Sequence, residues 1–223
     1  MNKSLLGCGG VLLIVGFIVV VALVVAGGSY NKLVGLQQAV DSSWAQVQNV
    51  YQRRADLVPN LVNTVAGAAE FEKSTMVEVT NARASIGRVT IDPNRAPTDP
   101  AQLQQFQQAQ GELGSALSRL LVVAENYPQL RATENFRDLQ AQLEGTENRI
   151  SVERGNFNRA VETYNVAVRR FPTNLLAGLF GFAPRPFFTS QPGAETAPTV
   201  DFRNLGNAPA ASPAPTPALE ASP

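Results

Sequence analysis

The stretch LQQFQQAQGELGSALSRLLVVAENY, Leu103 to Tyr127, carries apolar side chains at alternating intervals of three and four residues. The row is Leu103, Phe106, Gln110, Leu113, Leu117, Leu120, Ala124 and Tyr127. Residues with this spacing share one face of an α-helix, and a helix with such a face buries it against other helices. The stretch therefore predicts a bundle helix whose buried face has one polar member, Gln110.

Two further rows keep this spacing. The later row is Phe136, Leu139, Leu143, Thr146, Ile150, Glu153, Phe157, Ala160, Tyr164, Ala167 and Phe171. The earlier row is Leu33, Leu36, Val40, Ser43, Val47, Val50, Arg54 and Leu57. Trp44 and Tyr51 widen the earlier face, which is typical of bundle helices and not of a two-stranded coil. Because no segment of the sequence alternates as a strand does, we predict an all-α fold.

Prolines mark the ends of these helices. The segment IDPNRAPTDP, Ile91 to Pro100, holds three prolines, and Asp99 before Pro100 suits a helix N-cap followed by proline in the first turn. Pro128 marks a second break, since the residue before a proline is biased away from helical angles.

Pro59, in YQRRADLVPNLVNTV (Tyr51 to Val65), has two interpretations. The apolar rows stay roughly in phase across it, as in three long helices of which the first is kinked at Pro59. A corner, with Asp56 near the N-cap and Pro59 in the first turn, instead gives an up-and-down bundle of four helices of similar length. We favour the corner.

The N-terminus predicts a membrane anchor. No charged residue occurs between Lys3 and Lys32, and the 24 residues from Leu5 to Gly28 are long enough, at ~1.5 Å per residue, to cross a ~30 Å hydrocarbon core. A signal peptide has a shorter apolar core and a small-x-small cleavage site, so we favour a retained span. One lysine on each flank leaves its orientation open. We therefore expect an anchor at 1–28, a bundle at 29–182, and a Pro/Ala-rich tail at 183–223 that is too poor in apolar residues to fold.

Composition excludes several classes of function. The 18 basic and 18 acidic residues balance, which argues against a nucleic-acid partner. Histidine is absent and Cys8 is the single cysteine, which removes the usual zinc and di-iron ligand sets. The sequence also lacks phosphate-binding and hydrolase motifs. We expect no enzymatic activity, no cofactor and no metal.

Two charged side chains fall on apolar rows. Arg54 needs a carboxylate if it is buried, with Glu70, Glu72 or a glutamate of the last long helix as candidates; if the helix ends here, it reaches solvent instead. Glu153 lies on the last row, where a small shift in phase would expose it.

The segment FPTNLLAGLFGFAPRPFF, Phe171 to Phe188, follows the last long helix. Four alternating helices would return the chain to the membrane face at this point, and apolar side chains beside arginine are typical of a lipid interface. The candidates for lipid contact are Phe180, Phe182, Arg185, Phe187 and Phe188. The alternative is that the segment caps the open end of the bundle.

The blocks YQRRADLVPNLVNTVAGAAEFE and YPQLRATENFRDLQAQLEGTENRISVERGNFNRAVETYNVAVRRFP, with the GF that follows, resemble the bacterial LemA family over roughly residues 5–182. The resemblance implies a single-pass helical bundle at the cytoplasmic membrane, with a short N-terminus outside and the bundle in the cytoplasm. It brings no established catalytic residues. It marks Arg54, Asp56, Pro59 and Glu153 as structural positions within the similar blocks.

Two functions fit these observations. The protein is a membrane-anchored interaction or scaffold module that docks a membrane or envelope protein, or a membrane-shaping or envelope-stress element that acts through self-assembly and lipid contact.

Overall fold

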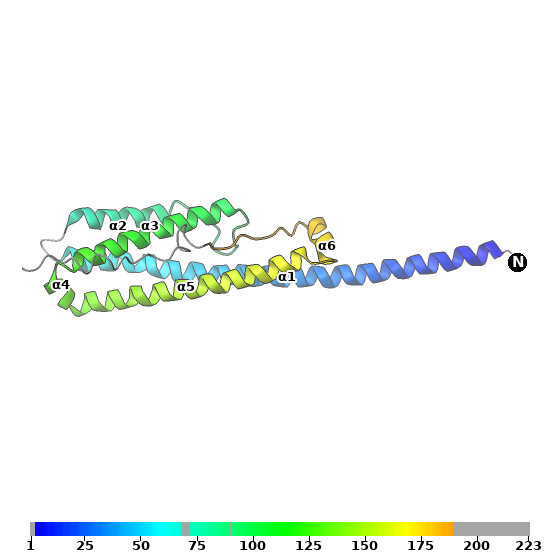
Figure 1. Cartoon of the computed structure of the whole chain (residues 1–223), viewed down its shortest axis with the longest axis horizontal. Helices are drawn as coiled ribbons and strands as arrows, with labels where there is room; N and C mark the ends of the chain where they lie inside the picture. The colour runs from blue at the N-terminus through cyan, green and yellow to red at the C-terminus, as the bar shows by residue number, and fades with distance from the viewer. Residues whose placement is uncertain (1–2, 68–71, 90, 190–223) are drawn as a thin grey trace, which may run out of the picture. The chain divides into compact units, whose positions relative to one another are not determined.

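The computed structural model describes residues 3–67, 72–89 and 91–189, and within them every regular element is helical (Figure 1). The helices are α1 (Lys3–Ala66), α2 (Lys73–Ile86), α3 (Pro100–Ala124), α4 (Pro128–Ala132), α5 (Glu134–Arg169) and α6 (Thr173–Phe180). The all-α prediction is confirmed. The breaks at Asp99 and Pro128 are where the prolines place them, and the Asp99 side chain accepts from the N–H of Ala101 as an N-cap.

The helices associate chiefly as two pairs, α1 with α5 and α2 with α3, while the short α4 lies between α3 and α5 along the chain (Figure 1). All three predicted rows supply buried side chains. In the row on α3, every member from Leu103 to Ala124 is buried, Gln110 included.

The core forms two clusters. The first surrounds Trp44, whose ring lies 5.3 Å from that of Phe106 and 5.6 Å from that of Phe157 between centroids. Aromatic pairs at such distances add to the stabilisation that burial alone provides. The second cluster is mainly aliphatic, with Phe136 as its buried aromatic member, and its fully buried leucines include Leu61, Leu113 and Leu120.

Pro59 lies inside α1, so the predicted corner is wrong. Val58, Leu61 and Val65 are buried on one continuous face, and burial of these side chains outweighs the loss of one helical hydrogen bond. Asp56 is not an N-cap: it lies within α1 and accepts a hydrogen bond from Nε2 of Gln52 at 2.8 Å. The alternative is a fold of three long helices, the first of which passes through Pro59. It is right about Pro59, but α1 ends at Ala66 and α2 is a separate helix.

The N-terminal part of α1 exposes an unbroken series of apolar side chains, from Leu13 to Val25 wherever the structure describes them. The same helix continues without a break to Leu33, the first fully buried residue among those of α1 whose side chains are described. The apolar segment and the first bundle helix are therefore one element.

α6 ends at Phe180, and Gly181 caps it in a left-handed conformation (φ 75°) that glycine tolerates best. The chain then runs without regular structure through Phe182–Phe188, which we call the strap. The compact unit extends to Phe188. The predicted tail lies outside the described residues from position 190 onward.

Candidate functional site

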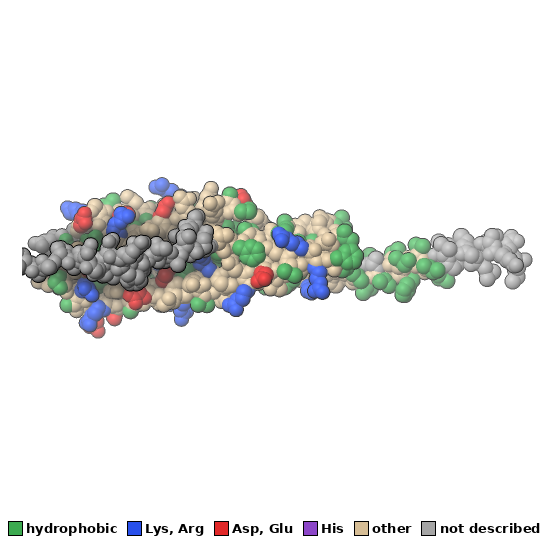
Figure 2. Space-filling model, in the orientation of Figure 1, with side chains coloured by type: hydrophobic (Ala, Val, Ile, Leu, Met, Phe, Trp, Pro, Cys, Tyr) green, Lys and Arg blue, Asp and Glu red, His purple; other side chains and the backbone are tan. Residues whose placement is uncertain are grey.

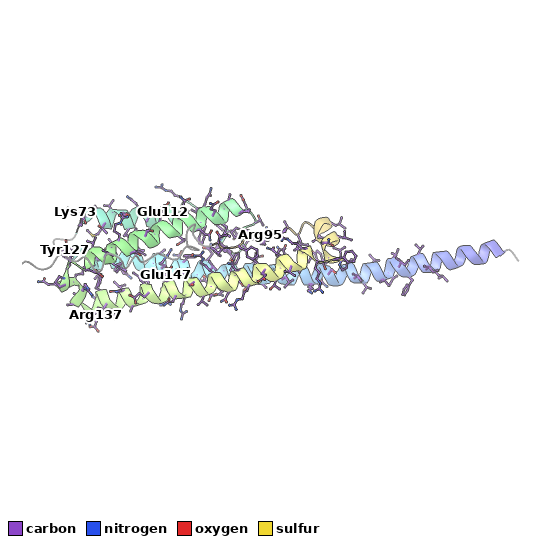
Figure 3. All side chains as sticks on the ribbon, in the orientation of Figure 1. Lys73, Arg95, Glu112, Tyr127, Arg137 and Glu147 are labelled. Atoms are coloured by element: carbon purple, nitrogen blue, oxygen red, sulfur yellow. The ribbon has the colours of Figure 1, made fainter. Side chains whose placement is uncertain are left out.

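Arg54 of α1 is buried and connects three helices. Its Nη1 donates to Oε2 of Glu147 on α5 at 2.9 Å. Its Nη2 donates to Gln110 on α3, to the backbone carbonyl at 2.9 Å and to the side-chain Oε1 at 2.6 Å. We call these three residues the polar layer; Figure 3 labels Glu147 on α5.

The polar layer separates the two core clusters. On α1 it lies between Tyr51 of the first cluster and Leu57 of the second. On α3 the corresponding neighbours are Phe106 and Leu113, and on α5 they are Ile150 and Leu143. On all three helices, the side chains therefore pass from the first core cluster to the second at the same level of the bundle.

The carboxylate predicted for a buried Arg54 is Glu147, a glutamate of the last long helix. Because the Glu147 side chain is 64% exposed, water screens the ion pair, and the two hydrogen bonds to Gln110 do more to offset burial of the guanidinium. The guanidinium also lies 5.1 Å from the centre of the Tyr51 ring, a cation–π distance. Nε of Arg54 is buried with no hydrogen-bond partner among the described residues.

Burial raises the pKa of Tyr51, and the positive charges of Arg154 and Arg54 oppose that shift. Burial likewise raises the pKa of Tyr164, against the opposing charge of Arg185. Both phenols therefore stay protonated at neutral pH and serve as hydrogen-bonding or packing groups.

Within the described residues, no three His, Cys, Asp or Glu side chains gather as they would to hold a metal ion. Glu153 is half-buried on α5 and accepts a hydrogen bond from Asn156 Nδ2 at 2.9 Å. The absence of a cofactor and of a metal stays a prediction.

The strap is held against α5 by two asparagines, Asn158 and Asn165, seven residues apart. Asn158 donates to the Phe188 carbonyl and accepts from the Phe188 N–H, both at 2.9 Å. Asn165 exchanges the same two bonds with Arg185, at 2.9 and 2.8 Å. Each carboxamide thus satisfies both backbone groups of one strap residue, as a neighbouring strand would. Sequence reasoning missed this pair, although two asparagines at heptad spacing were a signal.

Two of the five lipid-contact candidates do not lie at the surface. Arg185 is buried, and its Nη1 donates to the carbonyl of Ala96 at 2.6 Å. Phe188 is buried between the rings of Trp44 and Phe157. The asparagine bonds pull this stretch of backbone onto α5, so these two side chains serve the alternative role of capping the bundle.

The other three candidates lie nearer the surface. Phe182 packs partly buried on the first core cluster, while Phe180 and Phe187 are each about half exposed. More exposed apolar residues lie close by in sequence, with Phe171 74%, Leu175 66% and Leu179 76% accessible. Figure 2 shows hydrophobic side chains gathered at the end of the bundle from which the N-terminal part of α1 emerges. Their contact with lipid stays a prediction.

Comparison with known proteins identifies the family. The sequence profile of the LemA family matches residues 43–202, which include the polar layer and the strap. The chain belongs to the LemA family. The match begins after the apolar part of α1, which is the one described segment long and apolar enough to cross a membrane. LemA membership and this helix together fit a membrane-associated protein.

Several curated proteins are similar to this LemA-family chain. Magnetosome protein MamQ 2 of Paramagnetospirillum magneticum is 25% identical over 186 residues, covering 75% of this chain and 67% of the relative. Magnetosome protein MamQ of Magnetospirillum gryphiswaldense is 24% identical over 186 residues, again covering 75% of this chain and 67% of the relative. Protein LemA of Metamycoplasma hominis is 22% identical over 150 residues, covering 67% of this chain and 64% of the relative.

Proposed function

We propose that this protein is a single-pass, non-enzymatic interaction module at the bacterial cytoplasmic membrane, whose bundle presents docking faces to a membrane or envelope protein. The observation that supports this most is the continuity of α1. One helix of 64 residues includes the apolar segment and the first core residues, with no linker between them.

A continuous helix fixes the distance of the bundle from the apolar segment and the rotation of the bundle about the axis of α1. At ~1.5 Å per residue, α1 is about 96 Å long. α5 pairs with α1 along the bundle, and α2 and α3 are built beside them. The faces of the bundle therefore have a set orientation relative to the anchor, as a scaffold requires.

The relatives support a non-catalytic role. The names of the curated relatives associate three of them with the magnetosome and describe no enzymatic reaction. The buried Arg54 supports a structural role and not a catalytic one, because its two terminal nitrogens already donate hydrogen bonds to Gln110 and Glu147.

The exposed apolar side chains of α6 favour a second candidate function, a membrane-shaping element that acts through self-assembly and lipid contact. In that case the partner is a second copy of the chain and the bilayer itself.

Crosslinking in intact cells tests the first function. A photo-crosslinker replaces Val77 on α2 or Val122 on α3, because both side chains are exposed. One heterologous protein recovered in constant ratio is the expected result. Homotypic products alone would favour the second function.

A pair of insertions between Gly28 and Ser29 tests the role of the continuous helix. Seven alanines add about two helical turns and nearly preserve the rotation of the bundle, whereas seven glycines and serines of equal length break the coupling. We expect the alanine insertion to keep the heterologous crosslink and the flexible insertion to weaken it several-fold. Equal crosslinking in both variants would contradict fixed presentation.

A further inference from the structure

We propose that α6 and the end of α5 form a second membrane contact, which lies on the bilayer surface and binds the headgroups of anionic phospholipids. This inference rests on the anchoring part of the proposed function, since the contact requires that the apolar segment of α1 be in the membrane.

The first support is the two-sided character of α6. Leu175 and Leu179 lie four residues apart, about one helical turn, and both are exposed to solvent. Phe171, which precedes the helix and lies four residues before Leu175, is exposed too. Ala177, on the opposite side, is buried in the first core cluster. α6 thus faces the bundle with Ala177 and the half-buried Leu176, while Leu175 and Leu179 stay exposed, and a helix that only caps a core would bury such large apolar side chains.

The second support is the position of α6 beside α1. The Phe180 ring lies 5.1 Å from the Tyr30 ring, and the Phe182 ring lies 5.7 Å from it, both edge-on. Tyr30 follows the apolar segment directly, two residues before Lys32, and tyrosine is enriched where a span meets the headgroups. The ring contacts therefore hold α6 at the level where the bilayer surface lies.

The third support is charge. Arg169 ends α5 and Arg170 follows it, both with exposed side chains, and they line an open hollow of ≈ 430 Å³ together with Phe187. Glu162 lines it too, which leaves two guanidinium groups against one carboxylate. From Thr163 to Thr189 the sequence contains no acidic residue. Basic side chains next to exposed apolar ones suit a surface of anionic headgroups over acyl chains.

The fourth support is that the surface is preorganised. The strap follows α6 immediately and is held by Asn158 and Asn165, while α5 precedes it, so α6 is secured at both ends. The contact site is therefore already ordered, and it needs no folding step when it binds lipid.

The experiment uses the full-length chain in vesicles. In a Cys8→Ser background, Leu179→Cys carries an environment-sensitive fluorophore, and the vesicles contain lipids spin-labelled near the headgroup. Val152→Cys is the matched control, because Val152 is a comparably exposed apolar residue on α5. We expect quenching at position 179 to exceed that at position 152 several-fold.

Lipid class is tested with the same reporter. Quenching at position 179 should rise when anionic phosphatidylglycerol replaces part of the zwitterionic phosphatidylcholine, and Arg169→Gln with Arg170→Gln should remove that rise. Arg53→Gln with Arg131→Gln, which neutralises two other exposed arginines, should leave it intact. A rise that survives the first pair would overturn the headgroup assignment.

A third reporter separates this inference from the anchoring proposal. Val20→Cys labels the middle of the apolar segment. Quenching at position 20 by lipids spin-labelled deep in the acyl chains, without quenching at position 179, would overturn the second contact and leave the anchor standing. Absence of quenching at position 20 would reject the anchor, and with it the second contact.

Discussion

Arg83 on α2 donates from Nε to the backbone carbonyl of Ala55 at 3.0 Å. Ala55 lies four residues before Pro59, and proline has no N–H, so the helix itself provides no donor for that carbonyl. A side chain from the neighbouring helix supplies the missing donor. The interior proline thus creates an attachment point between α1 and α2.

A double-mutant cycle tests this relationship. Pro59→Ala restores the N–H, and we expect the free energy of unfolding in detergent to rise by about 1–3 kcal/mol. Arg83→Leu alone should lower it by about 0.5–1.5 kcal/mol, since one hydrogen bond is lost. In the Pro59→Ala background, Arg83→Leu should cost less. Equal costs in both backgrounds would show that the Ala55 carbonyl does not depend on Arg83.

The polar layer predicts unequal effects of its members. Arg54→Ala should lower the free energy of unfolding by about 3–5 kcal/mol, because it leaves Gln110 unpaired and opens a cavity. Glu147→Gln should cost less than about 1 kcal/mol, because that side chain is largely exposed. Arg53→Ala, next in sequence but exposed, is the control. Chemical denaturation measures all three, and equal losses for Arg54→Ala and Glu147→Gln would refute the dominant role of Gln110.

The asparagine pairs predict that the strap can be released locally. Asn165→Ala leaves the backbone groups of Arg185 unpaired in a buried position, which costs about 1–3 kcal/mol. We expect faster chymotrypsin cleavage after Phe187 and Phe188, with the rest of the bundle still resistant. Asn148→Ala, an exposed change on the same helix, should not alter the cleavage rate. Unchanged cleavage in Asn165→Ala would show that burial of Phe188 alone retains the strap.

Alkaline pH should weaken the fold through its buried phenols. The pKa of Tyr51 in the folded state lies above its ordinary value of about 10, so the unfolded chain loses this proton first as pH rises. Stability from this group is therefore complete below about pH 10 and is lost as pH rises through the folded pKa. Thermal melts of wild type and Tyr51→Phe should converge or cross above pH 10, with the variant less sensitive to pH. Parallel curves would exclude Tyr51 as a cause.

The apolar segment of α1 predicts how the protein leaves membranes. Detergent should extract it at full length, and high salt or alkaline carbonate should not, because the segment is held by burial in hydrocarbon and not by charge. Fractionation with mass measurement of the extracted chain checks this. Recovery of a soluble form beginning near Gly27 would reveal cleavage of a signal sequence.

The sequence was most informative where one physical effect dominates. Apolar spacing predicted the buried faces of α1, α3 and α5, and Asp99 with Pro100 predicted the start of α3, because these signals are local and unopposed. At Pro59 two effects compete, and the in-phase burial of Val58 and Leu61 outweighs the proline. The energy of that burial depends on α3 and α5, which lie far away in sequence.

The site was less predictable than the fold. That Arg54 needs a carboxylate followed from its place on the apolar row, but the identity of Glu147, 93 residues away, depends on the relative rotation of α1 and α5. Phe188 and Arg185 have the composition of a lipid-facing segment, and only the backbone pairing by Asn158 and Asn165 turns them inward. Composition alone does not distinguish the two environments.

If the apolar segment of α1 spans the bilayer as proposed, the tilt of the bundle follows bilayer thickness, because α1 is one unbroken helix from that segment into the bundle. A spanning helix adapts to a thinner membrane by tilting further. From Lys32 to Ala66 the helix extends about 50 Å, so a change of tilt of about 10° would move its far end by roughly 9 Å parallel to the membrane. Binding partners held at that distance would then be engaged or released according to the lipid composition around the anchor.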